Sequence, residues 1–174
     1  MSGGKMRSEI YWIDTPALGR LAIVPRPRGG DWLEDEASQW RAAGIDILVS
    51  LLSQQEIEDL ALAQERAACE AVGIRFREFP IVDRSVPMSK NALLDLAQEL
   101  GDRLKEGRNV AIHCRQGLGR APMVAAVILM MAGVDLESAL KRVAAARGYP
   151  IPETQEQRRW LSDFAKELFE SVPK

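Results

Sequence analysis

Cysteine and histidine are scarce in this sequence of 174 residues, which contains two cysteines and one histidine. Two cysteines cannot form the disulfide framework of a small secreted domain, and free thiols suit a reducing compartment. The three residues together also supply too few ligands for a structural zinc site, which normally has four. We therefore expect a protein of the cytoplasm without a structural zinc site.

An excess of one charge and a long hydrophobic run are lacking as well. The 23 Lys and Arg side chains and 25 Asp and Glu side chains leave a net charge of -2, and no long basic run is present. The sequence therefore predicts no nucleic-acid partner. The longest apolar run, Pro122 to Val134, is too short to span a bilayer and is expected to form a core helix. The polar N-terminal residues do not have the pattern of a signal peptide.

The order of strand and helix patterns predicts an α/β fold. Short apolar or alternating runs predict strands, and amphipathic or capped segments predict helices between them. The predicted strands are 9–14, 20–24, 45–52, 74–81 and 110–112, and the predicted helices lie at 32–43, within 54–72, and at 90–106, 122–131, 135–146 and 154–169. This order is typical of a central, mostly parallel sheet flanked by helices in a single domain. We expect a flexible tail over residues 1–8 and one domain over residues 9–174.

Three polar residues are expected to cap helices. Asp31, Ser53 and Ser89 each precede a predicted helix and can accept a hydrogen bond from its first turn. Glu56 follows Ser53 by three residues, which is the spacing of a capping box.

The segment from Asn109 to Met131 has the features of an anion site. An apolar strand is followed by a loop with Gly117 and Gly119 and then by a helix. The first turn of such a helix presents free N–H groups and the positive end of the helix dipole to the loop. Cys114 and Arg120 lie at the two ends of this loop. A helix N-terminus and a nearby arginine both favour the nucleophilic thiolate of a cysteine. The pattern therefore predicts chemistry on an oxyanion, in preference to a cysteine that serves only for packing.

The loop also carries a family resemblance. The eight residues HCRQGLGR, from His113 to Arg120, resemble the H-C-x5-R signature loop of the cysteine-dependent protein tyrosine phosphatases. They are similar to the loops of the dual-specificity and kinase-associated branch, and the likeness extends from about Ile45 to the C-terminus. The resemblance implies a phosphatase fold, with residues 9–174 as a dual-specificity phosphatase-like catalytic domain. It further implies hydrolysis of phosphomonoesters through a phosphocysteine intermediate, without a metal ion or another cofactor.

The same resemblance implies a role for each residue of the loop. Cys114 would attack phosphorus, and Arg120 would hold two phosphoryl oxygens with its planar guanidinium. His113 would support the loop through hydrogen bonds and would not transfer protons. Backbone N–H groups would bind the remaining oxygen charge, which makes the phosphate-binding residues Arg115, Gln116, Gly117, Leu118, Gly119 and Arg120.

Two further segments complete the expected site. Asp83 lies on the loop from Val82 to Met88, after a strand, where related dual-specificity phosphatases carry their general acid. A turn or cap residue is the alternative for this aspartate. The segment from Glu153 to Gln157 resembles the family's Q-T-x-x-Q loop, which orders the hydrolytic water. Gln157 matches the second glutamine and is expected to have a supporting role. Glu153 replaces the first glutamine, and we expect it to point away from phosphate or to start the last helix.

One departure from the family concerns the nucleophile itself. Relatives usually have Ser or Thr after the arginine, with a hydroxyl that donates a hydrogen bond to the cysteine sulfur, whereas this chain has Ala121. The departure predicts a less stabilised thiolate and slower breakdown of the phosphocysteine.

The sequence leaves the substrate open. A phosphorylated protein is the first expectation, and a phosphoinositide or another small phosphoester is the alternative, for which Arg115 could bind a second acidic group. A catalytically weak module that only binds phosphosites is a further alternative. Sulfur transfer is less favoured, because rhodanese-like loops differ in length or lack the distant acid.

Overall fold

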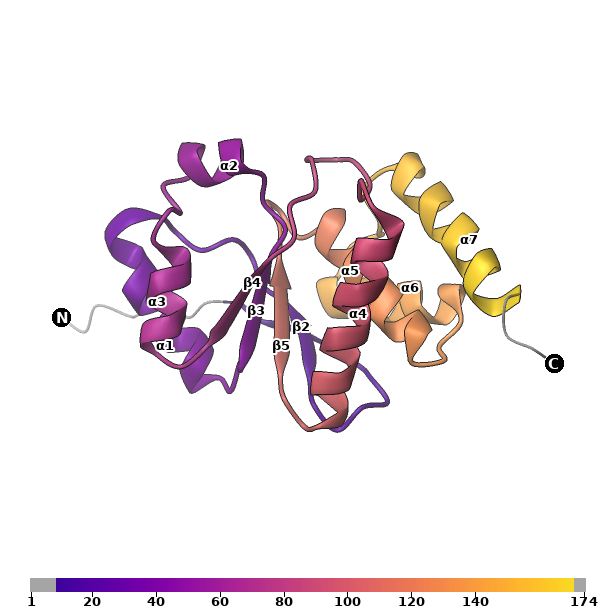
Figure 1. The fold of residues 1–174 in the computed structure, drawn as a ribbon, viewed down its shortest axis with the longest axis horizontal. Helices are drawn as coiled ribbons and strands as arrows, with labels where there is room; N and C mark the ends of the chain where they lie inside the picture. The colour runs from indigo at the N-terminus through magenta and orange to yellow at the C-terminus, as the bar shows by residue number, and fades with distance from the viewer. Residues whose placement is uncertain (1–8, 171–174) are drawn as a thin grey trace.

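A five-stranded sheet runs through the middle of the molecule (Figure 1). The computed structural model describes residues 9–170, so the tail predicted over residues 1–8 lies outside the described residues. The strands follow the order β1-β2-β5-β3-β4 across the sheet, and only the β1–β2 pair is antiparallel. Their bounds are β1 Tyr11–Ile13, β2 Leu21–Ile23, β3 Ile47–Ser50, β4 Arg75–Glu78 and β5 Val110–His113. The predicted mostly parallel sheet is confirmed.

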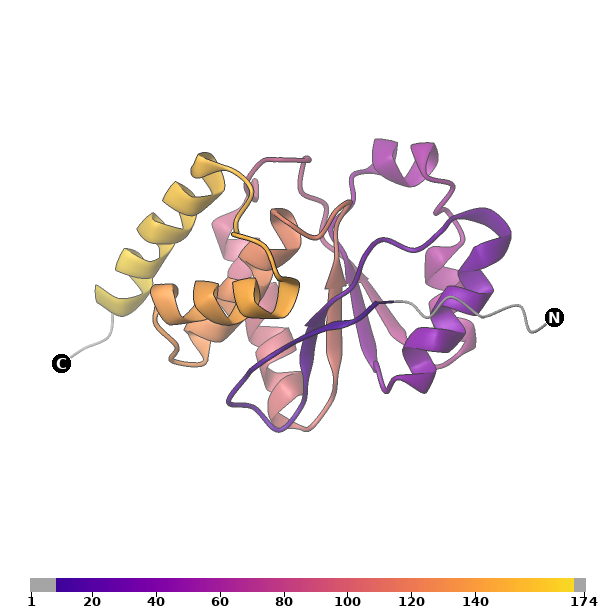
Figure 2. The same ribbon diagram turned by 180° about the vertical axis from the view of Figure 1, so that it is seen from behind.

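Helices cover both faces of the sheet. Helices α1 and α3 lie on one side, and α4, α5, α6 and α7 lie on the other, as the front and back views show (Figures 1 and 2). The bounds are η1 Gly30–Trp32, α1 Leu33–Ala42, α2 Gln54–Asp59, α3 Glu65–Ala71, α4 Lys90–Lys105, α5 Arg120–Met131, α6 Leu136–Arg147 and α7 Gln155–Glu170. The predicted α/β architecture is therefore present, with two short helices, α2 and α3, in the segment 54–72.

The strand residues alternate between two hydrophobic cores. In β5, Val110 and Ile112 pack into the core beneath α4, α5, α6 and α7, whereas Ala111 packs into the core beneath α1 and α3. Every residue of β2, β3 and β5 is buried. Strands that helices cover on both faces have no solvent side, which explains why their sequences are apolar except for Ser50 and His113 at the strand ends.

Helix α5 is buried along almost its whole length. All residues from Arg120 to Met130 are buried, because α5 contacts the sheet on one side and α4, α6 and α7 on the others. The apolar run that begins at Pro122 is therefore the core helix that the sequence predicts. Within residues 9–170, no helix is long and apolar enough to cross a membrane.

Two of the three predicted helix caps are confirmed. The Ser53 side chain accepts a hydrogen bond from the Glu56 N–H in a full capping box, and Ser89 accepts one from the Ala92 N–H. The prediction for Asp31 is wrong, because Asp31 lies inside the 3-10 turn η1 and α1 begins only at Leu33. The additional turn moves the start of α1 past the reach of the aspartate.

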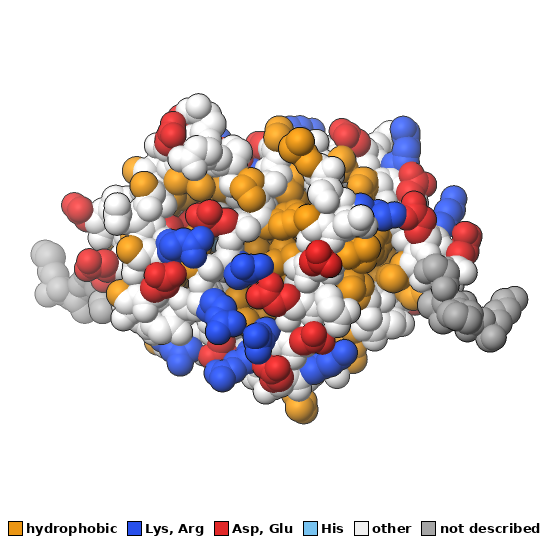
Figure 3. Space-filling view, in the orientation of Figure 1, with side chains coloured by type: hydrophobic (Ala, Val, Ile, Leu, Met, Phe, Trp, Pro, Cys, Tyr) orange, Lys and Arg blue, Asp and Glu red, His pale blue; other side chains and the backbone are white. Residues whose placement is uncertain are grey.

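The parallel strands place three loops at one edge of the sheet. The carboxyl ends of β3, β4 and β5 point the same way, toward the top of Figure 1, so the loops that follow them are neighbours. On the face of the molecule seen in Figure 1, many Lys and Arg side chains gather toward the lower left with Asp and Glu side chains among them, and hydrophobic side chains line a hollow in the upper middle (Figure 3). The fold therefore brings the predicted site loops together at one edge of the sheet.

Two glycines are expected to respond to alanine in opposite ways. At Gly19, in the turn between β1 and β2, an added Cβ would lie 1.9 Å from the Arg108 carbonyl oxygen, so Gly19→Ala should destabilise the protein by about 1–3 kcal/mol or more. At Gly101, inside α4, an added Cβ meets no atom within 4 Å, so Gly101→Ala should stabilise it by about 0.5–1 kcal/mol. Urea unfolding followed by tryptophan fluorescence measures both changes, and the same sign for both variants would contradict the packing described here.

Candidate active site

A small cavity lies where the loops after β4 and β5 meet the segment before α7. Its volume is about 100 Å³. The residues that line it come from the loop between β4 and α4, here named the acid loop (residues 79–89), from the signature loop (His113–Arg120), and from Glu153. They are Asp83, Arg84, Cys114, Gln116, Leu118, Gly119, Arg120 and Glu153. The structure thus brings Cys114, Arg120 and Asp83 together, although Asp83 is far from the other two in the sequence.

The Cys114 thiol lines this cavity and is otherwise enclosed. The residue is 2% exposed, and its Sγ accepts a hydrogen bond from the Gly117 N–H at 3.3 Å. Gly117 has a φ of +76°, a left-handed conformation that favours glycine. The loop then passes directly into α5, whose first turn begins at Arg120. Free N–H groups and the positive end of a helix dipole therefore lie beside the sulfur, as an anion site requires.

The Arg120 guanidinium is buried and held on both of its terminal nitrogens. Nη1 donates to Glu56 Oε1 at 2.6 Å and to the Ile81 carbonyl at 2.8 Å, and Nη2 donates to Glu56 Oε2 at 2.9 Å. Nη2 also donates to Asp83 Oδ1 at 2.9 Å. Burial alone would lower the pKa of Arg120, but the hydrogen bonds with Glu56 and the nearby negative charges raise it above its ordinary value. Arg120 therefore stays cationic and fixed in orientation.

Glu56 is a site residue that the sequence does not reveal. The sequence assigns it only to the capping box with Ser53, whereas the structure also gives it both hydrogen bonds to Arg120. Burial tends to raise the pKa of Glu56, but the hydrogen bonds from Arg120 and Ser53 outweigh burial and hold it below its ordinary value. The carboxylate therefore remains ionised and orients the arginine.

Asp83 is accessible from the cavity. Its side chain is 48% exposed, in contrast to Glu56 at 8%, so one carboxylate on Arg120 faces the solvent and the other is enclosed. The exposed carboxylate can move away from the guanidinium when another anion binds there. The buried one cannot, because Arg120 would lose its permanent counter-charge.

His113 lies beneath the loop and does not line the cavity. It is fully buried, its Nε2 contacts Glu65 Oε1, and its Nδ1 donates to the Cys114 carbonyl at 3.3 Å. The ring also stacks on Trp40 with 6.4 Å between centroids. These contacts fit a residue that holds the start of the loop in place.

Gln157 connects the acid loop to α7. It is fully buried, and its Nε2 donates to the Ser85 carbonyl at 3.0 Å, while its Oε1 accepts from the Thr154 N–H at 3.2 Å. An added Cβ at Gly119 would lie 2.9 Å from both atoms of the amide, so the glycine permits this close approach. Gln157 therefore packs against the signature loop and the acid loop together.

Glu153 does not behave as the sequence predicts. It lines the cavity instead of pointing away, and α7 begins two residues later, at Gln155. The physical reason is Arg84, whose Nη1 donates to Glu153 Oε1 at 2.7 Å and offsets its charge. The mouth of the cavity therefore carries an ion pair from two separate loops.

The two exposed side chains of the signature loop, Arg115 and Gln116, add no charge to the cavity lining. Arg115 is exposed and does not line the cavity, whereas Gln116 is exposed at its rim. Their expected share in phosphate binding thus rests on backbone N–H groups.

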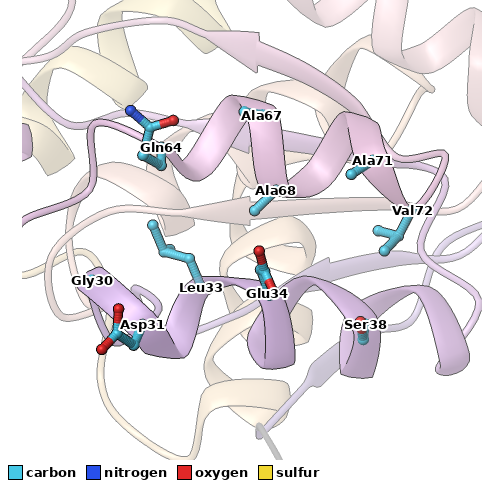
Figure 4. A pocket seen from close by; sticks show the side chains of 10 residues that line it. All are labelled: Gly30, Asp31, Leu33, Glu34, Ser38, Gln64, Ala67, Ala68, Ala71 and Val72. Carbon is cyan, nitrogen blue, oxygen red and sulfur yellow. The ribbon is translucent and has the colours of Figure 1, made fainter.

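A larger groove lies away from this chemistry, between α1 and α3 (Figure 4). Its volume is about 690 Å³, and small residues make up much of its lining. None of the ten lining residues is basic, and Asp31 and Glu34 are acidic, so the groove lacks the groups that bind an oxyanion. The small cavity at Cys114 is the better candidate site.

Comparisons with known proteins place the chain in a phosphatase family. A family model described as "Polymorphic toxin system, DSP-PTPase phosphatase" matches residues 24–134. Cyclin-dependent kinase inhibitor 3 of Rattus norvegicus is 24% identical over 138 residues, which make up 78% of this chain and 65% of that protein. The match therefore spans less than two thirds of that relative's length.

Two solved structures resemble the fold over nearly the whole chain. Kinase associated phosphatase, with a serine in place of its catalytic-site cysteine, superimposes with a TM-score of 0.84 at 21% identity and covers 97% of this chain and 99% of its own. At that identity the likeness shows the fold alone. Tk-PTP in its active form superimposes with a TM-score of 0.73 at 32% identity and covers 94% of this chain and 97% of its own.

Replacement of Glu56 is expected to lower stability in a pH-dependent way. Glu56→Gln keeps the shape but removes the charge that faces buried Arg120, so the free energy of unfolding at pH 7 should fall by about 1–3 kcal/mol. Because the folded pKa of Glu56 is lowered, its contribution is full above the unfolded pKa of about 4.3 and is lost as pH falls through the folded value. The difference between wild type and variant should therefore shrink below about pH 4.

Urea unfolding at a series of pH values measures this difference. Glu58→Gln is the matched control, because Glu58 lies on the same helix but is exposed and bonds only Gln54 among the described side chains. A gap that widens on acidification would contradict the buried ion pair.

Proposed function

Because the chain belongs to the cysteine-dependent protein tyrosine and dual-specificity phosphatases, we propose that it hydrolyses phosphomonoesters on proteins through a phosphocysteine intermediate. The observation that carries this proposal is the convergence of a thiol, a guanidinium and an exposed carboxylate on one cavity of about 100 Å³. The three groups supply the nucleophile, the oxyanion ligand and the acid that phosphoryl transfer to a cysteine requires.

In the first step, Cys114 Sγ attacks phosphorus. The S–P bond forms, the bond from phosphorus to the substrate oxygen breaks, and Asp83 gives that oxygen a proton. Arg120 and the N–H groups of the signature loop bind the phosphoryl oxygens, whose charge they stabilise most strongly in the transition state. Glu56 keeps the plane of the guanidinium fixed, so that this stabilisation needs no rearrangement.

Arrival of a phosphate group changes the contact between Arg120 and Asp83. The Nη2 atom that donates to Asp83 Oδ1 at 2.9 Å is the donor that a phosphoryl oxygen would use. The phosphate thus displaces Asp83, and the released carboxyl group can take up a proton from solvent and turn toward the leaving oxygen. The acid is held near its working position before substrate binds.

In the second step, water attacks phosphorus and Asp83 takes a proton from it. The S–P bond breaks, so that phosphate leaves and the Cys114 thiolate is restored. Gln157 supports this step by holding the Ser85 carbonyl and with it the acid loop. Ala121 carries no hydroxyl to stabilise the returning thiolate, so this step is the slower one.

The charge at the mouth favours a substrate with a single phosphate. Asp83 and Glu153 place two carboxylates at the cavity, where they pair with Arg120 and Arg84, while Arg115 lies outside the cavity lining. A second anionic group next to the bound phosphate would meet the carboxylates. This arrangement supports a phosphorylated protein side chain over a phosphoinositide headgroup.

Both cysteines of the chain are free thiols, which fits activity in the cytoplasm, where cysteines stay reduced.

Replacement of Cys114 tests the reaction itself. The wild type should hydrolyse an aryl phosphate in the presence of a chelator, and Cys114→Ser should lose activity by at least about 1,000-fold, because a serine hydroxyl is not ionised near neutral pH. Cys69→Ala is the control, since burial raises the pKa of Cys69 to about 12 and makes it a poor nucleophile. An inert wild type that still binds a phosphopeptide would instead indicate a phosphosite-binding module, and an active Cys114→Ser would exclude the mechanism.

Replacement of Asp83 tests the acid. Asp83→Asn should lower turnover by about 10²–10⁴-fold on a substrate whose leaving oxygen needs a proton, and far less on one with a good leaving group. Steady-state rates on aryl phosphates of graded leaving-group acidity measure this dependence. Asp95→Asn, an exposed aspartate on α4, should leave all the rates unchanged. Equal losses on every substrate would rule out proton donation by Asp83.

A further inference from the structure

One peptide unit connects Arg147 to the Cys114 sulfur. The N–H of Gly117 donates to Cys114 Sγ at 3.3 Å, and the carbonyl of Gln116, at the other end of the same peptide, accepts from Arg147 Nη2 at 3.2 Å. In a planar trans peptide the N–H and the C=O point in opposite directions. The Arg147 guanidinium on one side of the loop therefore influences the Gly117 N–H, which faces the Cys114 sulfur on the other side.

Arg147 holds the following peptide as well. Its Nε donates to the Gly117 carbonyl at 3.0 Å, so one guanidinium binds two successive carbonyls of the signature loop. This two-point contact turns the carbonyls outward and leaves the opposite N–H groups to the inner side of the loop. An added Cβ at Gly117 would lie 3.4 Å from Arg147 Nε, a contact distance, so the guanidinium lies directly against the loop.

Aromatic side chains keep Arg147 in this place. It is the last residue of α6, and its guanidinium carbon lies 4.2 Å from the Tyr11 ring centroid and 5.4 Å from that of Tyr149. A cation above aromatic faces is attracted to them, which fixes a long side chain that would otherwise be mobile. The contact with the loop is therefore part of the packed structure.

The position after Arg120 gives this contact its significance. Ala121 is fully buried and follows the arginine directly, where a hydroxyl would otherwise donate to the sulfur. Within residues 9–170, the Gly117 N–H is the only group that donates a hydrogen bond to Cys114 Sγ. We propose that Arg147 is a positioning residue that favours the Cys114 thiolate through the Gln116–Gly117 peptide and compensates for the hydroxyl absent at Ala121. This inference rests on the proposed function, in which Cys114 is the nucleophile.

Two physical effects act in the same direction. A hydrogen bond from a cation to the carbonyl polarises the peptide and strengthens the hydrogen bond that its N–H donates. The positive charge of Arg147 also favours an anion at the sulfur directly, as cationic neighbours of reactive cysteines do. Because Arg147 is partly exposed, solvent screens the charge and the expected effect is moderate.

The pH dependence of alkylation by iodoacetamide tests the proposal. Alkylation rates follow the thiolate, so Arg147→Met should move the midpoint of the profile at Cys114 to higher pH by about 0.5–1 unit. Cys69 is fully buried and should not contribute to the signal. Arg142→Met is the matched control, because it removes the same charge from the same helix, and the Arg142 side chain donates to the Asp14 carbonyl instead of the signature loop. The alkylation profile of this variant should equal that of the wild type.

Two further variants separate thiolate stabilisation from a general packing role. Ala121→Ser, added to Arg147→Met, should move the midpoint back toward the wild-type value, because the new hydroxyl replaces the lost support. Arg147→Lys keeps the charge but cannot bind both carbonyls with one planar group, so the midpoint of its alkylation profile should lie between those of the wild type and Arg147→Met. Arg147→Lys also serves if the methionine variant does not fold.

An unchanged midpoint in both Arg147 variants, or an equal change in Arg142→Met, would overturn the inference. A midpoint that Ala121→Ser does not move back would overturn the compensation. Alkylation needs no turnover, so these results are independent of phosphatase activity. A wild type that fails to hydrolyse an aryl phosphate would remove the proposed function and leave the alkylation result standing.

Discussion

The ion pair between Arg120 and Glu56 is the interaction on which the site depends. A buried guanidinium needs a permanent counter-charge, and Glu56 supplies it through two hydrogen bonds of 2.6 and 2.9 Å. The pair also connects α2 to the start of α5, while the hydrogen bond to the Ile81 carbonyl connects the loop after β4. The guanidinium that is proposed to bind phosphate is thus the same group that connects α2, the acid loop and the start of α5.

The signature loop is held from several directions around this pair. His113 and Glu65 fix its beginning from the sheet side, and Arg147 holds its carbonyls from the outer side. The cavity itself is left to groups that can exchange partners, since Asp83 is half exposed and Glu153 is paired with Arg84. The buried contacts therefore lie behind the loop and the more exposed ion pairs lie at the mouth, which suits the proposed binding and release of phosphate.

Much of the fold follows from local patterns. The strands are readable because parallel strands covered on both faces have continuous apolar sequences, and the caps at Ser53 and Ser89 are readable because a cap acts within one turn. Asp31 shows the limit of this reasoning, since one additional 3-10 turn moved the helix start beyond its reach. The roles of Asp83 and Gln157 in the reaction stay predictions, although the structure places both beside the signature loop.

The sequence by itself determined the signature loop, the α/β order of elements and the family, because each depends on residues that are close along the chain. The tertiary structure alone decided which partners surround that loop. Glu56 lies 64 positions from Arg120, and Arg147 lies 30 positions from Gly117, so neither contact leaves a local pattern in the sequence. Glu153 faces the cavity for the same reason, because its charge is offset by Arg84, 69 positions away. Long-range electrostatic pairing is set by how the loops meet, and only the folded chain brings them together.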